Sequence, residues 1–370
     1  MNILFVSHLS GSSFAGPTYS VPKQVEAQAT IDNIFWYNAS AMGKEEWKSL
    51  PYYHDLTEFP DESIYSLPDP FDKPDIVIVE QFYNMARSNI RKELVKGKFP
   101  YIIIPRGELT NQAQMRKRMK KSLANIFMFR KFARNALAIQ YLTEQEYIDS
   151  GDKWNSKHIV IPNGIDIPAT AKTEFSTDGI KCVSIGRIEP YQKGLDLLIE
   201  ACSLIKNELY KANCTITICG PDREGKLESI KKMVAEKDLQ EIVLFHDAVY
   251  RKEKEKMLLD SDVFVMPSRF EGHPMALIEA LSYGLPVIAT TGSNMRKVID
   301  EYKTGWTADC NAKSIARALM KMINNFQSIK NYSKSSIELS KQFSWKLIAK
   351  LQKEQLYSIL NCEKELLEDY

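Results

Sequence analysis

The segment from Gly186 to Gly194 combines residue types that could bind a phosphate group. It follows an apolar run, precedes a helical pattern and places Arg187 and Lys193 six residues apart. A fork-shaped guanidinium and a point-charge ammonium together suit a diphosphate. Glycines let the backbone approach a ligand, and the N-terminus of the following helix favours an anion. The alternative is that both cations are solvated surface residues.

A second segment, from Pro267 to Met275, offers carboxylates that could hold hydroxyl groups. Glu271 falls in a turn rich in glycine and proline, and Glu279 falls eight residues later in a helical stretch. Ionised carboxylates accept hydrogen bonds from vicinal hydroxyls, as the acidic residue of dinucleotide folds does for ribose. The two carboxylates could therefore hold two polyhydroxylated parts of one ligand. The alternative is a helix-cap neighbour and a surface glutamate.

Two further turns follow expected strands, which is where ligands bind in α/β sheets. Gly16 precedes Pro17, which could begin a helix at its first position. Gly220 follows an apolar run and precedes Pro221. A plain turn is the alternative for both, because the surroundings of Gly16 match neither common phosphate-binding glycine motif. The sequence predicts no metal site, since its five His residues are dispersed and it has no HExxH motif.

Short apolar runs alternate with longer helical patterns, and these elements must position the residues above. Runs rich in Ile and Val are typical of strands that are buried on both faces of a parallel sheet. The alternation predicts doubly wound α/β domains. The predicted strands are Asn2–Ser7, Ile34–Tyr37, Asp75–Val79, Tyr101–Pro105, Ala138–Leu142, His158–Pro162, Lys181–Ile185, Thr215–Cys219, Ile242–Phe245, Val263–Met266 and Pro286–Ala289.

The length of 370 residues suggests about two domains. The polar, turn-rich segment Pro162–Gly179 lacks periodicity, and the strand pattern restarts at Lys181. We therefore predict two doubly wound domains of similar size, residues 1–166 and 167–345, with a cleft between them. The segment Met42–Lys73 shows no clear periodicity, and no element is predicted there.

Composition narrows the class of protein. The net charge of +2 argues against a globally basic nucleic-acid binder. Six Cys residues without a CxxC pair argue against a disulfide framework and a structural zinc site. The start of the sequence is typical of a first strand rather than a signal peptide, and no apolar stretch approaches 18 residues. A reduced, cytoplasmic location is therefore expected.

The order and spacing of these features together resemble the retaining glycosyltransferases of family 4 (group 1), whose GT-B fold has two Rossmann-like domains. The last matching segment contains the E-x7-E spacing of that family. The resemblance implies an N-terminal acceptor domain (1–166), a C-terminal nucleotide-sugar donor domain (167–345) and a last helix (346–370) that packs back on the first domain. The matching segments are Ile161–Asp166, Gly186–Gly194, Ile218–Asp222 and Pro267–Thr290.

The resemblance also implies a role for each matching residue. Arg187 and Lys193 would bind the donor diphosphate and neutralise the leaving group, and with Glu271 they would form the catalytic set. Glu279 would bind the nucleotide ribose, and Gly16 would place its backbone near the phosphates across the cleft. The resemblance implies a nucleoside-diphosphate sugar as co-substrate. It also implies no metal cofactor, because the family is generally metal-independent, and no dedicated protein base. Further donor contacts are implied for Gly186, Gly220, Gly272, His273, Pro274 and Met275.

One position departs from the common family pattern. Many members have a histidine after an apolar strand of the first domain, where this chain has Arg106 between Pro105 and Gly107. This form resembles members of bacterial polysaccharide assembly. Arg106 could contact the donor phosphate or the acceptor. The alternative is a structural salt bridge to Glu108 or elsewhere.

A basic segment lies between Leu109 and Thr143, with eight Lys or Arg residues and no Asp or Glu. Apolar residues recur there every three to four positions, and a basic amphipathic helix is typical of membrane-surface binding. The alternatives are a buried helix with a solvated basic face and a nucleic-acid patch, which the scarcity of aromatic residues on the basic part disfavours. The predicted membrane contacts are Arg116, Lys117, Arg118, Lys120 and Lys121.

These observations predict a hexosyltransferase that acts, with retention, on a lipid-linked saccharide in cell-surface polysaccharide biosynthesis. Its partners would be the nucleotide-sugar donor, that acceptor and an anionic membrane surface, with no nucleic acid. It would be peripheral on the inner face of the cytoplasmic membrane. The alternatives are a GT-B enzyme with a soluble acceptor and a non-catalytic scaffold of a glycan assembly complex, and the intact Arg187, Lys193, Glu271 and Glu279 argue against a scaffold.

Overall fold

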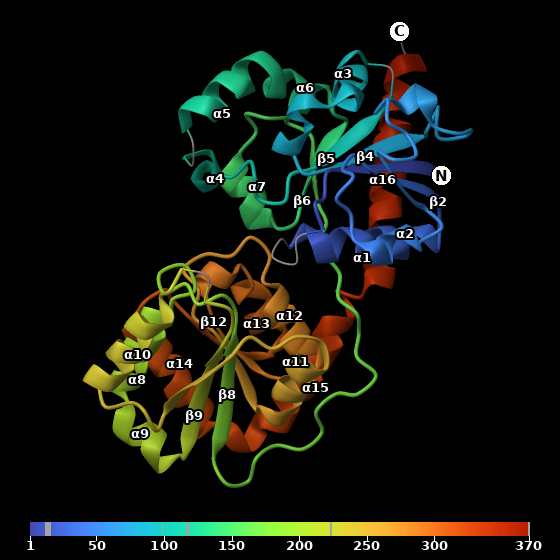
Figure 1. Cartoon of the computed structure of the whole chain (residues 1–370). Helices are drawn as coiled ribbons and strands as arrows, with labels where there is room; N and C mark the ends of the chain where they lie inside the picture. Colours follow the sequence, from blue (N-terminus) through green and yellow to red (C-terminus); the bar gives the residue numbers. More distant parts are fainter. Residues whose placement is uncertain (12–15, 98, 116–117, 223, 369–370) are drawn as a thin grey trace. The chain divides into compact units, whose positions relative to one another are not determined.

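The computed structural model describes residues 1–11, 16–97, 99–115, 118–222 and 224–368. It divides into two compact units (Figure 1). Unit 1 holds Met1–Gly164 together with the chain from Trp345 onward, and unit 2 holds Ile165–Ser344.

The sheet of unit 1 is parallel throughout, in the order β3-β2-β1-β4-β5-β6-β7. The order reverses between β1 and β4, which opens a crevice at the carboxyl ends of these strands. Its strands are β1 (Asn2–Ser7), β2 (Asn33–Asn38), β3 (Tyr53–Asp55), β4 (Ile76–Glu80), β5 (Tyr101–Ile104), β6 (Ala138–Tyr141) and β7 (His158–Val160).

Helices cover both faces of this sheet. Gly16 caps α1 and Pro17 is its first residue, which confirms the predicted helix start. The last helix packs along α1 in this unit, with Trp345, Ile348 and Leu356 in the same apolar cluster as Val21 (Figure 1). The helices are α1 (Pro17–Ala29), α2 (Glu45–Lys48), α3 (Asn89–Val95), α4 (Asn111–Met115), α5 (Arg118–Ala124), the π-helical turn η3 (Asn125–Phe129), α6 (Arg130–Asn135), α7 (Glu144–Ser150) and α16 (Trp345–Glu368), with short 3-10 turns at Ile64–Ser66 and Tyr83–Arg87.

The sheet of unit 2 is also parallel, in the order β10-β9-β8-β11-β12-β13. Here the order reverses between β8 and β11, so the corresponding crevice lies at the carboxyl ends of these two strands. Its strands are β8 (Ile180–Ile185), β9 (Cys214–Cys219), β10 (Val243–His246), β11 (Val263–Met266), β12 (Val287–Thr290) and β13 (Gly305–Ala308).

Two apolar clusters, one on each face, hold the helices of unit 2 against its sheet. The amphipathic pattern Leu195, Leu198, Ile199 and Cys202 buries one side of α8 in the first cluster. The helices are α8 (Leu195–Leu204), α9 (Lys206–Lys211), α10 (Leu227–Glu236), α11 (Arg251–Asp260), α12 (Met275–Ser282), α13 (Arg296–Tyr302), α14 (Ala312–Asn324) and α15 (Ile329–Lys341), with 3-10 turns at Thr291–Ser293 and Phe326–Ser328.

Candidate active site

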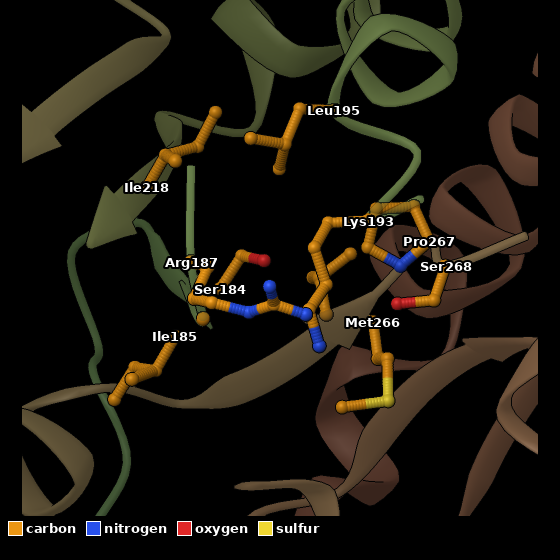
Figure 2. Close-up of a pocket in the computed structure, with 11 residues that line it drawn as sticks. Ser184, Ile185, Arg187, Lys193, Leu195, Ile218, Met266, Pro267 and Ser268 are labelled. Carbon is orange, nitrogen blue, oxygen red and sulfur yellow. The ribbon is translucent and has the colours of Figure 1, made fainter. Parts of the chain in front are cut away.

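A small pocket lies in the crevice between β8 and β11 (Figure 2). Its lining comes from the carboxyl ends of β8, β9 and β11, from the loop before α8 and from the first residue of α8. Arg187 and Lys193 both line it, and in Figure 2 both side chains extend toward the middle of the view. The lining residues are Ser184, Ile185, Gly186, Arg187, Lys193, Leu195, Ile218, Val265, Met266, Pro267 and Ser268.

Lys193 and Glu271 form the central ion pair of this site. Lys193 Nζ donates to both carboxylate oxygens of Glu271, at 2.7 and 3.0 Å. Ser268 Oγ donates to Glu271 Oε1 at 2.5 Å, and Asn294 Nδ2 donates to the Glu271 carbonyl at 2.7 Å. The Glu271 side chain is only 7% exposed. A cation and a carboxylate are therefore held in fixed positions beside the crevice, although 78 residues separate them in the sequence.

Two glycines allow the loops to pack this closely. Gly194 caps α8 with φ of +64°, and a Cβ there would lie 2.0 Å from the Pro267 carbonyl oxygen. Gly220 lies against Gly186, and a Cβ there would lie 1.7 Å from the Gly186 carbonyl oxygen. Only glycine fits such approaches of one backbone to another. These contacts fix the loops after β8, β9 and β11 against one another.

A second carboxylate, Glu279, lies on α12 and pairs with Lys254 of α11. Both side chains are partly exposed. A bidentate pair joins Arg269 to Asp196 of α8, with both nitrogen–oxygen distances at 2.7 Å. The hydrogen bonds to Asp196 raise the pKa of Arg269. The sequence alone indicated neither Lys254 nor the pair of Arg269 and Asp196. In both ion pairs the two partners lie on different elements, so no local spacing connects them.

The remaining predicted donor residues of unit 2 lie at the same edge of its sheet. Arg187 is exposed, and its Nη2 donates to Gln192 Oε1 at 3.2 Å rather than to either glutamate. Gly272 is exposed, and Pro274 caps α12. His273 Nδ1 lies 3.0 Å from Met275 Sδ.

Gly16 and Arg106 belong to unit 1. Gly16 caps α1, and among the described residues no atom outside its chain neighbours lies within 4 Å of the place where its Cβ would be. Arg106 follows β5 with φ of +51°, in the left-handed region that residues with a Cβ rarely adopt.

The Arg106 guanidinium lies within a buried polar network, with its side chain 5% exposed. Its Nε donates to Glu80 Oε2 at 2.6 Å, and Glu80 is fully buried. The salt bridge thus joins β5 to the end of β4 rather than to Glu108, whose Oε2 accepts from the Phe82 and Tyr83 amides instead. The other guanidinium bonds go to Ser20 Oγ (3.1 Å), Asn163 Oδ1 (2.9 Å) and Gln24 Oε1 (2.7 Å).

Two buried carboxyls near this network have raised pKa values. Burial raises the pKa of Glu146, although the Leu142 and Gly107 amides and the Arg106 charge act in the opposite direction. Burial also raises the pKa of Glu108. The hydrogen bonds that its carboxylate accepts from two backbone amides, and the charge of Lys121, lower this pKa by less than burial raises it. In both cases loss of water outweighs the hydrogen bonds that favour the charged form.

From Arg118 to Asn135 the basic segment is helical without a break, because α5, the π-helical turn η3 and α6 follow one another directly. Arg116 and Lys117 lie outside the described residues, as do the side chains of Arg118 and Lys120. Lys121 Nζ donates to the Ala113 carbonyl at 2.7 Å. Five apolar side chains of this segment are exposed: Met115 (69%), Met119 (83%), Leu123 (61%), Ile126 (57%) and Phe127 (82%).

The described residues lack two further features, a membrane-spanning helix and a group of metal ligands. None of their helices combines the length and apolar character needed to span a bilayer. In the same ranges, no three His, Cys, Asp or Glu side chains are grouped as metal ligands would be.

Comparison with known proteins identifies similar sequences and a shared fold. The model of the family "Glycosyl transferases group 1" matches residues 168–338, most of unit 2. The amylovoran biosynthesis glycosyltransferase AmsK of Erwinia amylovora is 31% identical over 152 residues, which cover 39% of this chain and 36% of AmsK. The chain thus spans well under two thirds of the length of this curated relative.

Solved structures match over nearly the whole chain. Sucrose-phosphate synthase from Thermosynechococcus elongatus is similar with a TM-score of 0.71 at 17% identity, covering 98% of this chain and 99% of that one. Anabaena HepE in complex with UDP is similar with a TM-score of 0.69 at 17% identity, and the match covers 97% of this chain and 100% of HepE. The chain has the GT-B fold, and its residues 168–338 match the model of the glycosyl transferases group 1 family.

Proposed function

We propose that the chain is a retaining glycosyltransferase of cell-surface polysaccharide biosynthesis. It transfers a hexosyl unit from a nucleoside-diphosphate sugar to a lipid-linked saccharide. The observation that supports this most strongly is the grouping of Arg187, Lys193 and Glu271 at the crevice between β8 and β11. The family of residues 168–338 and the name of AmsK point to the same class of reaction.

In this proposal, the donor diphosphate binds at the β8–β11 crevice. Arg187 and Lys193 supply two positive charges there, and the lysine ammonium exchanges part of its contact with Glu271 for phosphate oxygens. Glu271, with the backbone of residues 272–275, binds the hydroxyls of the donor sugar. Glu279 binds the ribose hydroxyls, and Lys254 holds its carboxylate in place. Gly186 and Gly220 leave room for the nucleotide because they lack side chains.

Transfer then needs no group beyond donor, acceptor and these side chains. The bond between the anomeric carbon and the diphosphate oxygen breaks, and the acceptor hydroxyl oxygen attacks the same face of that carbon. The acceptor proton passes to the departing phosphate oxygen. Arg187 and Lys193 stabilise the negative charge that develops on the leaving group, which is the electrostatic role that a metal ion performs in other enzymes.

Donor binding is tested by thermal unfolding with UDP, GDP, ADP, CMP and dTDP and their sugars, with and without EDTA. A ligand that binds only the folded chain raises the melting temperature according to RT ln(1+[L]/Kd). We expect one base to raise it and EDTA to leave that shift unchanged. A shift abolished by EDTA would contradict metal independence, and no shift with any nucleotide would favour the scaffold alternative.

The proposal assigns acceptor binding and membrane contact to unit 1. Gly16, at the start of α1, and Arg106, at the end of β5, stay predicted contacts of the phosphates or the acceptor. The exposed apolar side chains of the basic segment would enter the lipid surface, while its cations would face anionic headgroups. The exposure of these side chains argues against the alternative of a buried helix. The enzyme would then act on the inner face of the cytoplasmic membrane.

Membrane binding is tested by replacing two of the most exposed apolar residues, Met119 and Phe127, with serine. Burying an apolar side chain contributes about 1.5–3 kcal/mol. We therefore expect M119S/F127S to weaken binding to vesicles that contain anionic lipid by at least about tenfold. Flotation measures the bound fraction, and the shift of melting temperature by the nucleotide serves as a check of unit 2.

The matched control replaces Leu204 and Leu244, two exposed apolar residues of unit 2, with serine. It should bind vesicles like the wild type. Equal loss in both double variants, or no loss in M119S/F127S, would contradict membrane contact through the basic segment.

A further inference from the structure

An open pocket of about 570 Å³ lies in unit 1, beneath α4, α5 and η3. Figure 1 shows α4, α5 and α7 along one flank of this unit, and both α5 and α7 contact α4. The pocket is separate from the β8–β11 crevice, which belongs to unit 2. Its described lining includes three cations and no acidic residue. The cations are Lys121, Arg130 and Lys153.

The charge of this pocket is suited to an anion. Lys153 Nζ donates to Asn111 Oδ1 at 2.7 Å, and Arg130 is exposed. Among the described residues, neither has a carboxylate partner within salt-bridge distance. Lys121 lies over the Tyr83 ring, with its Nζ 4.6 Å from the centroid. Several cations around one pocket are typical of sites for phosphate groups.

A buried donor in the lining also lacks an acceptor. Trp154 lines the pocket, is 4% exposed, and its ring packs at 5.4 Å against Phe82. Its indole Nε1–H has no hydrogen-bond partner among the described residues. Buried polar groups are nearly always hydrogen-bonded, and an unpaired one costs about 1–3 kcal/mol. Because this nitrogen has almost no exposed surface, the indole must turn toward the pocket for a ligand oxygen to provide the missing acceptor.

Apolar side chains at the pocket define the rest of the ligand. Met115 and Ile126 line it and are 69% and 57% exposed. They also belong to the exposed apolar set of the basic segment, so the pocket adjoins the surface proposed to contact lipid. Between them, Asn125 Nδ2 and Tyr83 OH both donate to Gln114 Oε1, at 3.1 and 2.9 Å, which fixes the polar part of the lining.

We propose that this pocket binds the phosphate or diphosphate group of an anionic lipid, namely the lipid carrier of the saccharide acceptor. The anion lies near Arg130 and Lys153, and the Trp154 indole turns so that its Nε1–H donates to one of the anion's oxygens. The first part of the lipid chain passes Met115 and Ile126. The identity of this lipid as the acceptor's carrier rests on the proposed function. The inference that the pocket binds an anionic amphiphile is independent of the proposed function.

The direct test uses farnesyl diphosphate, a soluble amphiphile, with farnesol and inorganic diphosphate as its two halves. Binding to the full chain is measured by calorimetry with UDP present to fill the nucleotide site. The Trp154 indole resonance is followed by NMR and assigned through W154F. We expect farnesyl diphosphate to bind at least about tenfold tighter than either half and to shift that resonance, because charge and apolar contact both contribute.

A matched pair of variants locates the site. R130Q/K153Q removes the two lining cations, whereas K131Q/R134Q removes two exposed cations of α6 that do not line the pocket. We expect the first to weaken farnesyl diphosphate binding at least about tenfold and the second less than about twofold. Equal weakening by both pairs, or an unshifted Trp154 resonance at saturation, would overturn the proposal.

The same variants separate this proposal from the proposed function. R130Q/K153Q should keep the nucleotide-induced shift of melting temperature and donor hydrolysis, because those belong to unit 2. If the wild type binds farnesyl diphosphate but no nucleotide sugar, the glycosyltransferase proposal fails and the lipid site stands. If transfer to a lipid-linked acceptor is equally fast in R130Q/K153Q and wild type, the pocket is not the acceptor site.

Discussion

Replacing Lys193 with alanine is expected to lower the rate of sugar transfer by about 10²–10³-fold, the usual cost of removing one group that stabilises developing charge. Lys193 lines the β8–β11 pocket and is held by both oxygens of Glu271. Without its ammonium, the departing diphosphate keeps only the Arg187 charge. The rate is measured as release of nucleoside diphosphate with and without acceptor, and folding by thermal unfolding.

Two controls accompany this variant. K232A removes an exposed lysine of α10, 78% exposed, and should transfer sugar like the wild type. E271A removes the carboxylate partner while leaving the lysine, and it should also lose most of its activity because it loses the predicted sugar contact. Wild-type turnover in a folded K193A chain would refute the assignment of the catalytic set.

Replacing Arg106 with methionine is expected to lower the free energy of unfolding by about 3–5 kcal/mol, the cost of leaving a buried charge without its partner. Glu80 is fully buried, and its Oε1 already lacks a partner among the described residues. The substitution also removes the bonds to Ser20, Gln24 and Asn163. Urea unfolding, followed by circular dichroism, measures the loss.

A second substitution distinguishes charge from packing. E80Q in the R106M background removes the uncompensated carboxylate, and it should recover part of the lost stability. R134M, which removes an exposed arginine of α6, should change the free energy of unfolding by less than about 0.5 kcal/mol. A loss below about 1 kcal/mol in R106M would show that the network contributes little.

The central strands could be predicted from sequence because they are buried on both faces, which requires continuous apolar runs. Ile76–Glu80 and Val287–Thr290 lie within one residue of the predicted ranges. Two strands were missed, Tyr53–Asp55 and Gly305–Ala308. Both lie at the edge of a sheet, where a strand has one neighbour and polar residues are tolerated. Sequence periodicity does not separate such short edge strands from loops.

Motif spacing identified which residues to consider in unit 2, but not their partners. The contacts of Lys193 with Glu271 and of Lys254 with Glu279 join elements whose approach depends on the whole sheet. For Arg106 the alternatives stayed open, because its bonding groups come from three segments that lie far apart in the sequence: the end of β4, α1 and Asn163. One of them, Glu80, lies at the end of β4, where its apolar neighbours suggest no charge.

The basic segment shows a different limit of sequence patterns. Phe127 is 82% exposed, whereas Phe129 and Phe132 are buried. All three belong to one apolar series in the sequence, and periodicity does not tell an apolar face that meets the core from one that meets solvent. The π-helical turn at Asn125–Phe129 changes the angular spacing just where this difference arises.

The place of α16 in unit 1 has a consequence for synthesis of the chain. Unit 2 is continuous, so all of its residues are synthesised before α16. Unit 1 must wait, because Trp345, Ile348 and Leu356 complete its apolar cluster and Gln352 bonds to Gln24 of α1. Until α16 has left the ribosome and packed, unit 1 therefore exposes one side of α1. A nascent chain that stops before α16 would offer chaperones that uncovered surface.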